Sequence, residues 1–347
     1  MTIRAARLLP FSLAPVIEDV VDRIELRLRF GPRFDRVRAR PLAVMTQRRR
    51  LDAFLAEQAA ASGVDFRDGC PARAVELAER GVTVRTNGER VRADAVIGAD
   101  GANGITARAL RLCSRPAYGV ALEGNLPLDA VDARRYRGRI VFELGVVRGG
   151  YGWIFPKGDH LNVGVGGWQR EARTLRNHLA RVCREHGFSD TRLRDLRGHR
   201  LPVRTPEAEL ARGRALVVGD AAGLVDPFTG DGIYEAFVSA TVAADATADL
   251  LAGRTRDLTA YERRVKGVLA RELSTAWAAK IVLDRAPSVM FAVARSELVQ
   301  VGLERLARGE RAAPGASRFP RAPLSLLGSL ARTAGNRGHA VATRRAF

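Results

Sequence analysis

The segment from Ala215 to Phe237, ALVVGDAAGLVDPFTGDGIYEAF, constrains the fold of this chain most strongly. Its apolar start predicts a short buried strand that ends in a glycine-rich elbow, where α/β folds bind ligands. Small side chains let the backbone approach a bulky planar or phosphorylated ligand, and a long helix to Leu251 then presents its positive end. An ordinary strand–loop–helix is the alternative. The residues expected to bind the ligand here are Gly219, Asp220, Gly223, Pro227, Gly230, Asp231, Gly232 and Ile233.

A second elbow of the same kind follows Asp94, in DAVIGADGANGITAR. A nearly all-apolar run, expected to be a strand buried on both faces, ends at Gly98. We expect Asp100 and Gly101 to take part in binding, with Arg108 about two turns into a following helix. A turn merely capped by Asp100 is the alternative.

A third segment, YGWIFPKGDHLNVGVGG, begins at Tyr151. The alternation of aromatic residues has the period of a strand, so the rings should project from one face as a flat wall. Glycines thin the next strand, where a long apolar ligand could lie against the backbone. An aromatic stripe that serves as core is the alternative. The residues predicted to bind a substrate are Tyr151, Trp153, Phe155, Gly164 and Gly166.

Together the two elbows resemble the paired motifs of FAD-dependent oxidoreductases with the p-hydroxybenzoate hydroxylase fold. In that family the first motif supports the pyrophosphate and the nicotinamide donor, and the second binds ribitol and the flavin ring. The serine usual in the first motif is replaced here by Gly104. The third segment resembles the Y-x-W-x-F-P-K…N-x-G-x-G segment of the geranylgeranyl reductase branch. Arg48 fits that family's R-x-x-[FL]-D pattern, which implies a contact with FAD, and a solvated basic helix start is the alternative.

The resemblance implies a mixed α/β fold with an FAD/NAD(P)-binding doubly wound sheet, an inserted antiparallel-sheet substrate domain and a helical C-terminal region. No strand–GxGxxG–helix unit is found, so we expect the sheet to lack its first βαβ unit, as in an N-terminally truncated chain. The expected parts are a partial FAD-binding domain (1–116), a substrate-binding sheet (117–200), the return of the FAD-binding domain (201–256) and a helical C-terminal region with a basic tail (257–347).

Local patterns complete the expected secondary structure. Residues 22–30 alternate as a half-buried strand, with 38–46 as the expected partner. A helix is predicted from Arg49 to Ser62, where Gly63 stops it, and Asn87-Gly88 predicts a hairpin turn.

The net charge of +19 does not indicate nucleic-acid binding, because the chain has 54 arginines but only three lysines and no interleaved aromatic residues. The three cysteines are far apart and predict neither disulfides nor a metal site. No apolar run has the roughly 18–20 residues of a membrane span. We expect a cytoplasmic protein, with peripheral contact at the inner face of the membrane through the arginine-rich residues 303–347; a plain disordered basic tail is the alternative.

The function implied by the resemblance is reduction of C=C double bonds in isoprenoid chains of lipids, quinones or prenyl diphosphates. FAD would be the cofactor, with NAD(P)H or another reductant as electron donor. Tyr151, Lys157 and His160 are polar residues near the aromatic wall, but the sequence singles out no catalytic residue. A flavin-dependent aromatic hydroxylase and a non-catalytic remnant with weak or no FAD binding are the alternatives.

Overall fold

A computed structural model describes residues 1–113, 116–203 and 208–310. The chain divides into two compact units. Unit 1 contains residues 1–62, 120–199 and the described residues from 277 on, and unit 2 contains 63–119 and 200–276. Most of the predicted basic tail (311–347) lies outside the described residues. The four-part domain division stays a prediction.

Unit 2 contains two small sheets. One has the strand order β14-β15-β8, in which β15 runs parallel to β8 and antiparallel to β14. The other is the antiparallel meander β5-β6-β7, whose second hairpin turns at Asn87-Gly88 as predicted. The strands are β5 (Ala74–Ala78), β6 (Gly81–Arg85), β7 (Arg90–Ala93), β8 (Val96–Gly98), β14 (Ala211–Arg212) and β15 (Ala215–Val217).

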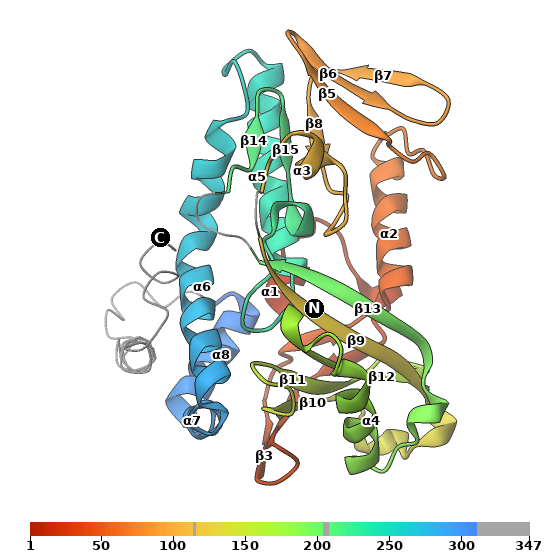
Figure 1. The fold of residues 1–347 in the computed structure, drawn as a ribbon, viewed down its shortest axis with the longest axis vertical. Coiled ribbons are helices and arrows are strands. Elements are labelled where there is room, and N and C mark those ends of the chain that lie inside the picture. The colour runs from red at the N-terminus through yellow and green to blue at the C-terminus, as the bar shows by residue number, and fades with distance from the viewer. Residues whose placement is uncertain (114–115, 204–207, 311–347) are drawn as a thin grey trace. The chain divides into compact units, whose positions relative to one another are not determined.

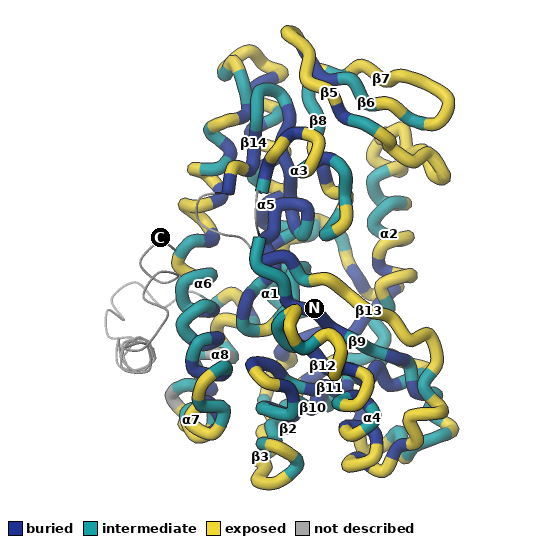
Figure 2. The backbone as a smooth tube through the Cα atoms, in the orientation of Figure 1, coloured by how far each residue is buried: buried dark blue, intermediate teal, exposed yellow. Residues whose placement is uncertain are grey.

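The core of unit 2 forms where helix α5 (Ile233–Leu251) lies against β15. Small side chains permit this close approach: a Cβ on Gly219 would lie 3.1 Å from the Cβ of Ala236. The hydroxyl of Tyr261 donates to the carbonyl of Val217 at 3.1 Å, so its buried polar atom is satisfied. Figure 2 shows buried stretches along α5, whereas the β6–β7 hairpin is largely exposed.

Unit 1 is built on a seven-stranded sheet with the order β13-β9-β12-β11-β10-β2-β3 (Figure 1). Strands β10, β11 and β12 are antiparallel neighbours, as the sequence predicted, and β2 joins β10 in parallel. A separate antiparallel pair is formed by β1 and β4. The strands are β1 (Asp19–Val21), β2 (Arg23–Leu28), β3 (Arg33–Val37), β4 (Ala43–Met45), β9 (Ala117–Pro127), β10 (Arg139–Leu144), β11 (Tyr151–Pro156), β12 (His160–Trp168) and β13 (Arg194–Val203).

One face of this sheet is closed by helix α4 (Leu175–Glu185), as Figure 1 also shows. Leu175, Leu179 and Val182 recur at helical spacing and are buried against Ile154 and Val163 of the sheet. Because side chains alternate along each strand, the residues between these point to the opposite face, where the aromatic residues of β11 lie.

Helix α2 (Arg48–Ala61) matches its prediction closely and ends at Ser62, where Gly63 takes a positive φ of 91°. The remaining elements are η1 (Ala14–Val16), η2 (Leu128–Ala130), η3 (Ala133–Arg135), η4 (Gln169–Glu171), η5 (Asp190–Arg192), η6 (Gly219–Ala222), α1 (Ile3–Ala6), α3 (Thr106–Ala109), α6 (Ala260–Arg285), α7 (Pro287–Ala294) and α8 (Glu297–Arg308). The mixed α/β fold with a largely antiparallel sheet and C-terminal helices confirms the predicted fold class.

Three local expectations were wrong. Strand β2 pairs with β3 rather than with residues 38–46, because Arg29 and Phe30 take positive φ and reverse the chain earlier. Strand β8 is not buried on both faces: Ile97 is 41% exposed, since β8 is the edge strand of the described three-stranded sheet. Arg108 lies in a helix of a single turn, α3, rather than two turns into a longer one.

Candidate functional site

The two predicted elbows leave the same edge of one sheet in unit 2. Strands β8 and β15 run parallel, with Gly98 opposite Val217, and the N–H of Val218 donates to the carbonyl of Gly98 at 3.0 Å. Their carboxyl ends therefore lie side by side, which is where open α/β sheets bind ligands. The two elbows therefore begin at neighbouring strand ends.

The first elbow is organised by the carboxylate of Asp100. One of its oxygens accepts from the N–H of Ile105 at 2.7 Å, and from the N–H and hydroxyl of Thr106 at 2.8 and 2.9 Å. A Cβ on Gly104 would lie 2.2 Å from the Asp100 carboxyl carbon, so the serine of the family motif would not fit without displacing this cap. Gly101 has a φ of +73° and open space where its side chain would be.

The second elbow is a turn of small residues that needs its glycines. Gly219 has a φ of +53°, and its N–H donates to the buried hydroxyl of Ser239 on α5 at 3.0 Å. Gly223 ends the 3₁₀ turn η6 in the left-handed conformation. At the far end of the loop, a Cβ on Gly232 would lie 2.9 Å from a carboxylate oxygen of Asp220. The loop thus closes on itself, with the first turn of α5 beside the end of β15.

Between these ends, the loop is held by Asp226, which the sequence analysis missed. Its carboxylate accepts from the N–H groups of Phe228 and Thr229, the two residues after Pro227, at 2.9 and 2.7 Å. Burial raises the pKa of the Asp226 carboxyl above its usual range. The Asp-Pro-x-Thr pattern is a turn signal that could have indicated this role.

The remaining predicted residues of this loop complete the start of α5. Gly230 has a φ of +68°, and its N–H donates to the carbonyl of Asp226 at 2.9 Å. The carboxylate of Asp231 accepts from the N–H of Ile233, the first residue of α5, at 3.1 Å. A cradle of glycine and alanine backbone at a sheet edge, beside a helix N-terminus, fits a bulky anionic ligand such as FAD. The roles of the individual residues in binding it stay predictions.

Arg48, the remaining predicted cofactor residue, lies in unit 1 at the first position of α2. Its guanidinium is exposed and forms a two-pronged ion pair with Asp52, one turn on, at 3.1 and 3.2 Å. Its contact with FAD stays a prediction.

The predicted aromatic wall exists as a continuous row of rings in unit 1. The ring centroids of Tyr151 and Trp153 are 6.0 Å apart, and those of Trp153 and Phe155 are 6.2 Å apart. Phe142 on the neighbouring strand β10, which the sequence analysis missed, lies 5.5 Å from both Tyr151 and Phe155. Its place two residues after Ile140 in the apolar run Ile140-Val141-Phe142 was the available signal. We call Phe142, Tyr151, Trp153 and Phe155 the aromatic row.

The indole of Trp153 is held by a close fit over Gly164 and by a hydrogen bond to Asn162. Its position opposite Gly164 in the β11–β12 pair leaves room for the ring, because a Cβ on Gly164 would lie 2.1 Å from the indole. Gly166 is less tight, with 3.5 Å to the same ring. The indole N–H donates to the buried side chain of Asn162 at 2.8 Å. The indole thus covers Gly164, and the contact of both glycines with a substrate stays a prediction.

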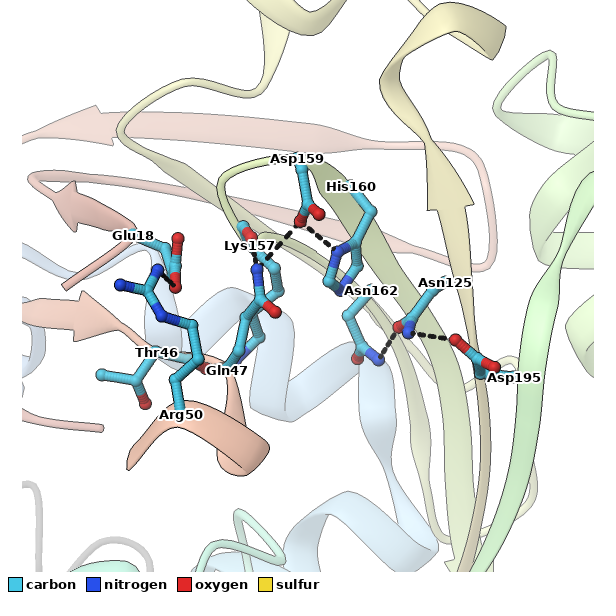
Figure 3. Close-up of polar contacts among 10 residues, drawn as sticks. All are labelled: Glu18, Thr46, Gln47, Arg50, Asn125, Lys157, Asp159, His160, Asn162 and Asp195. Carbon is cyan, nitrogen blue, oxygen red and sulfur yellow. Dashed lines mark hydrogen bonds and ion pairs between the residues drawn. The ribbon is translucent and has the colours of Figure 1, made fainter. Parts of the chain in front are cut away.

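A polar chain extends from Asn162 across the sheet. Its amide donates to Asn125 on β9 at 3.3 Å, and Asn125 donates in turn to Asp195 on β13 at 3.3 Å (Figure 3). Beside it, His199 bonds Glu123 at 3.1 Å, and this contact raises the pKa of the imidazole. The same face of the sheet therefore changes from aromatic on β10 and β11 to polar on β9 and β13.

The polar candidates from the sequence already have structural partners. The ammonium of Lys157 donates to the carbonyl of Thr46 at 2.9 Å, and His160 bonds Asp159 at 2.7 Å. Gln47 joins the two by donating to the carbonyl of Lys157 and to Asp159, both at 2.9 Å (Figure 3). Within the described residues, no group of three or more His, Cys, Asp or Glu side chains could hold a metal ion.

Comparison with known proteins gives this geometry a family. The FAD binding domain family matches residues 29–272, well over half of the chain. A digeranylgeranylglycerophospholipid reductase 2 of Methanothermobacter thermautotrophicus is 30% identical over 79% of this chain and 74% of its own length. The chain belongs to the geranylgeranyl reductase family of FAD-binding proteins.

Two further comparisons concern the length and the fold of the chain. An uncharacterized protein of Methanosarcina barkeri is 31% identical over 68% of this chain, which spans 60% of that protein's length. The crystal structure of a geranylgeranyl bacteriochlorophyll reductase-like protein from Thermoplasma acidophilum superposes with a TM-score of 0.74 at 24% identity, over 92% of this chain and 85% of that one. This geranylgeranyl reductase family member therefore has the fold expected of it, and the family's cofactor is FAD.

Proposed function

We propose that this protein is an FAD-dependent oxidoreductase that reduces C=C double bonds in isoprenoid chains. The observation that carries the proposal is the aromatic row, whose rings contact one another along β11. A relative of the chain is named as a digeranylgeranylglycerophospholipid reductase, which supports the same proposal. Flat rings suit a prenyl chain, whose double bonds and methyl groups offer apolar and π surface but few hydrogen-bonding atoms.

The residues of each unit have distinct parts in this proposal. The elbows of unit 2, including Asp100, Gly219 and Gly232, would hold FAD, which supplies a hydride when reduced. The aromatic row of unit 1 would orient the prenyl chain of the substrate and exclude water. One carbon of each alkene would take up the hydride, and the other carbon would take up a proton. We propose NAD(P)H or another reductant as the source of electrons.

The substrate class is an isoprenoid lipid or a prenyl diphosphate, taken up at a membrane surface. None of the described helices is long and apolar enough to span a bilayer. The leucine-rich part of the predicted membrane-contacting tail (324–327) lies outside the described residues.

The test is single-turnover reduction under anaerobic conditions. Protein loaded with FAD is reduced by dithionite and mixed with geranylgeranyl diphosphate or an unsaturated prenyl lipid, and the products are analysed by mass spectrometry. The proposal expects reoxidation of the flavin absorbance and a gain of H₂ per double bond. Flavin that binds but stays reduced in the presence of every prenyl substrate would refute it. In a separate aerobic assay, oxygen-dependent hydroxylation of an aromatic compound would favour the hydroxylase instead.

A further inference from the structure

Lysine is rare in this chain, and one of its lysines is buried. The sequence has three lysines among 57 lysine and arginine residues, so arginine supplies nearly every positively charged side chain. Lys280 on α6 is only 6% exposed. Burial of a cation costs free energy unless its hydrogen bonds are replaced, so the contacts of this side chain define what it does.

The ammonium of Lys280 lies in a compact cage. It donates to the carbonyl of Gly149 at 2.6 Å and pairs with the carboxylate of Asp284 one turn on. It also lies 4.2 Å from the centroid of the Trp168 ring, and the indole N–H of Trp168 donates to Asp284 at 2.7 Å. Three N–H groups thus face a carbonyl, a carboxylate and a π face. The planar fork of an arginine does not match such a small cage.

The cage closes on the turn that precedes the aromatic row. Gly149 has a φ of +65°, and a Cβ there would lie 2.8 Å from the Asp284 carboxylate. Gly150 is tighter still, since a Cβ would lie 1.9 Å from the carbonyl oxygen of Gly166 on β12. The turn is therefore clamped between α6 on one side and β12 on the other, and the next residue is Tyr151, the first ring of the row.

We propose that Lys280 is a positioning residue for the aromatic row, which acts by fixing the Gly149–Gly150 turn and thereby the ring of Tyr151. The proposal rests on the proposed function, because it assigns the row a prenyl chain to bind. With its donors already engaged, Lys280 is a structural cation and does not transfer the proton to the alkene. Loss of the clamp is expected to weaken substrate binding rather than the chemical step.

The first experiment follows Tyr151 directly and needs no turnover. The full chain with bound FAD is labelled with meta-fluorotyrosine, whose five fluorine resonances are assigned in part by Tyr151→Phe. Lys280→Met should shift or broaden the Tyr151 resonance and leave most others unchanged. The matched control is Lys266→Met, which breaks only the exposed pair of Lys266 with Glu262 on the same helix. An unmoved Tyr151 resonance in Lys280→Met overturns the proposal.

The second experiment measures steady-state reduction of a prenyl substrate. Lys280→Met should raise KM about tenfold and keep kcat within about twofold, as expected for lost ground-state binding. Combined with Tyr151→Ala, it should add nothing to the KM defect of Tyr151→Ala alone, because both changes remove the same ring contact. Additive defects, or an equal loss of kcat, overturn the positioning role.

Failure of the proposed function and failure of the role of Lys280 give different results in these experiments. If wild-type protein reduces no prenyl substrate, the proposed function fails, while the fluorine signal of Tyr151 still decides the role of Lys280. If Lys280→Met yields no folded protein, Asp284→Asn removes the charge partner within nearly the same volume and is read by the same two measurements.

Discussion

Gly164 is the position where one added carbon tests the aromatic row most directly. In Gly164→Ala the new Cβ would lie 2.1 Å from the indole of Trp153, far inside van der Waals contact. The ring has little freedom to yield, because the side chain of Asn162 holds its N–H and the rings of Tyr151 and Phe155 flank it. The substitution must therefore displace the indole or bend strand β12.

The expected cost follows from two contributions. Overpacking a well-packed core costs about 1–3 kcal/mol, and the loss of the bond between Trp153 and Asn162 costs about 1 kcal/mol more. We expect a total of about 2–4 kcal/mol in the free energy of unfolding, together with a weakened affinity for prenyl substrates. The measurement is urea denaturation followed by tryptophan fluorescence.

A matched control lies two residues along the same strand. In Gly166→Ala the new Cβ would lie 3.3 Å from a backbone carbonyl oxygen and 3.5 Å from the indole, so small adjustments suffice. We expect a cost of about 1 kcal/mol or less, typical of a mild small-to-large change. Equal destabilisation by the two alanines would refute the argument that Gly164 makes room for Trp153.

Three further predictions concern other parts of the chain. Asn162→Leu removes the partner of the Trp153 N–H and should lower the free energy of unfolding by about 1–3 kcal/mol, measured by urea denaturation; an unchanged midpoint would contradict this. Burial raises the pKa of Asp226 in the folded state, so the wild type loses stability relative to Asp226→Asn as pH rises above about 4, the ordinary carboxyl pKa. Urea midpoints of both proteins, measured between about pH 4 and 8, test this. Midpoints that change with pH in parallel would contradict it. Burial raises the pKa of Cys183 to about 12, so this thiol should resist alkylation in the native protein at mildly alkaline pH, while the exposed Cys70 reacts, as mass spectrometry would show.

The sequence predicted those parts of the fold that depend on local chemistry. The elbow at Gly219 was predicted because a turn of positive φ after a buried strand requires glycine. The three rings of the row on β11 were predicted because the period of two fixes which residues share a face of a strand. In both cases the local pattern alone determines the geometry.

The reversal at Arg29 and Phe30 could not be predicted in the same way. Both residues take positive φ in the turn between β2 and β3, a conformation for which Asn-Gly is the usual signal. The turn is held instead by tertiary contacts: the N–H of Phe30 donates to the carboxylate of Glu143, which is buried and also pairs with His186 and Arg27. Such long-range contacts leave no periodic trace in the sequence.

The cage of Lys280 was missed for a related reason. Gly149, Trp168 and Asp284 are far apart in the chain, and only the fold brings them around one ammonium. The bias toward arginine is visible in the composition, where it argues against nucleic-acid binding but does not point to Lys280. The same bias makes each remaining lysine informative, since arginine was the available alternative almost everywhere else.

The family motif of the first elbow is also a folding signal, which affects how its residues should be interpreted. The carboxylate of Asp100 caps the turn of α3, and that of Asp231 accepts from the first N–H of α5, so both are explained by local structure without a ligand. Gly104 follows from the same cap, because a side chain there would collide with Asp100. Gly101 is different: its positive φ requires glycine, yet the space beside it is open. Gly63 and Gly69 show the same combination of positive φ and open space in ordinary turns, so the turn alone explains this glycine and its part in holding a cofactor stays a prediction.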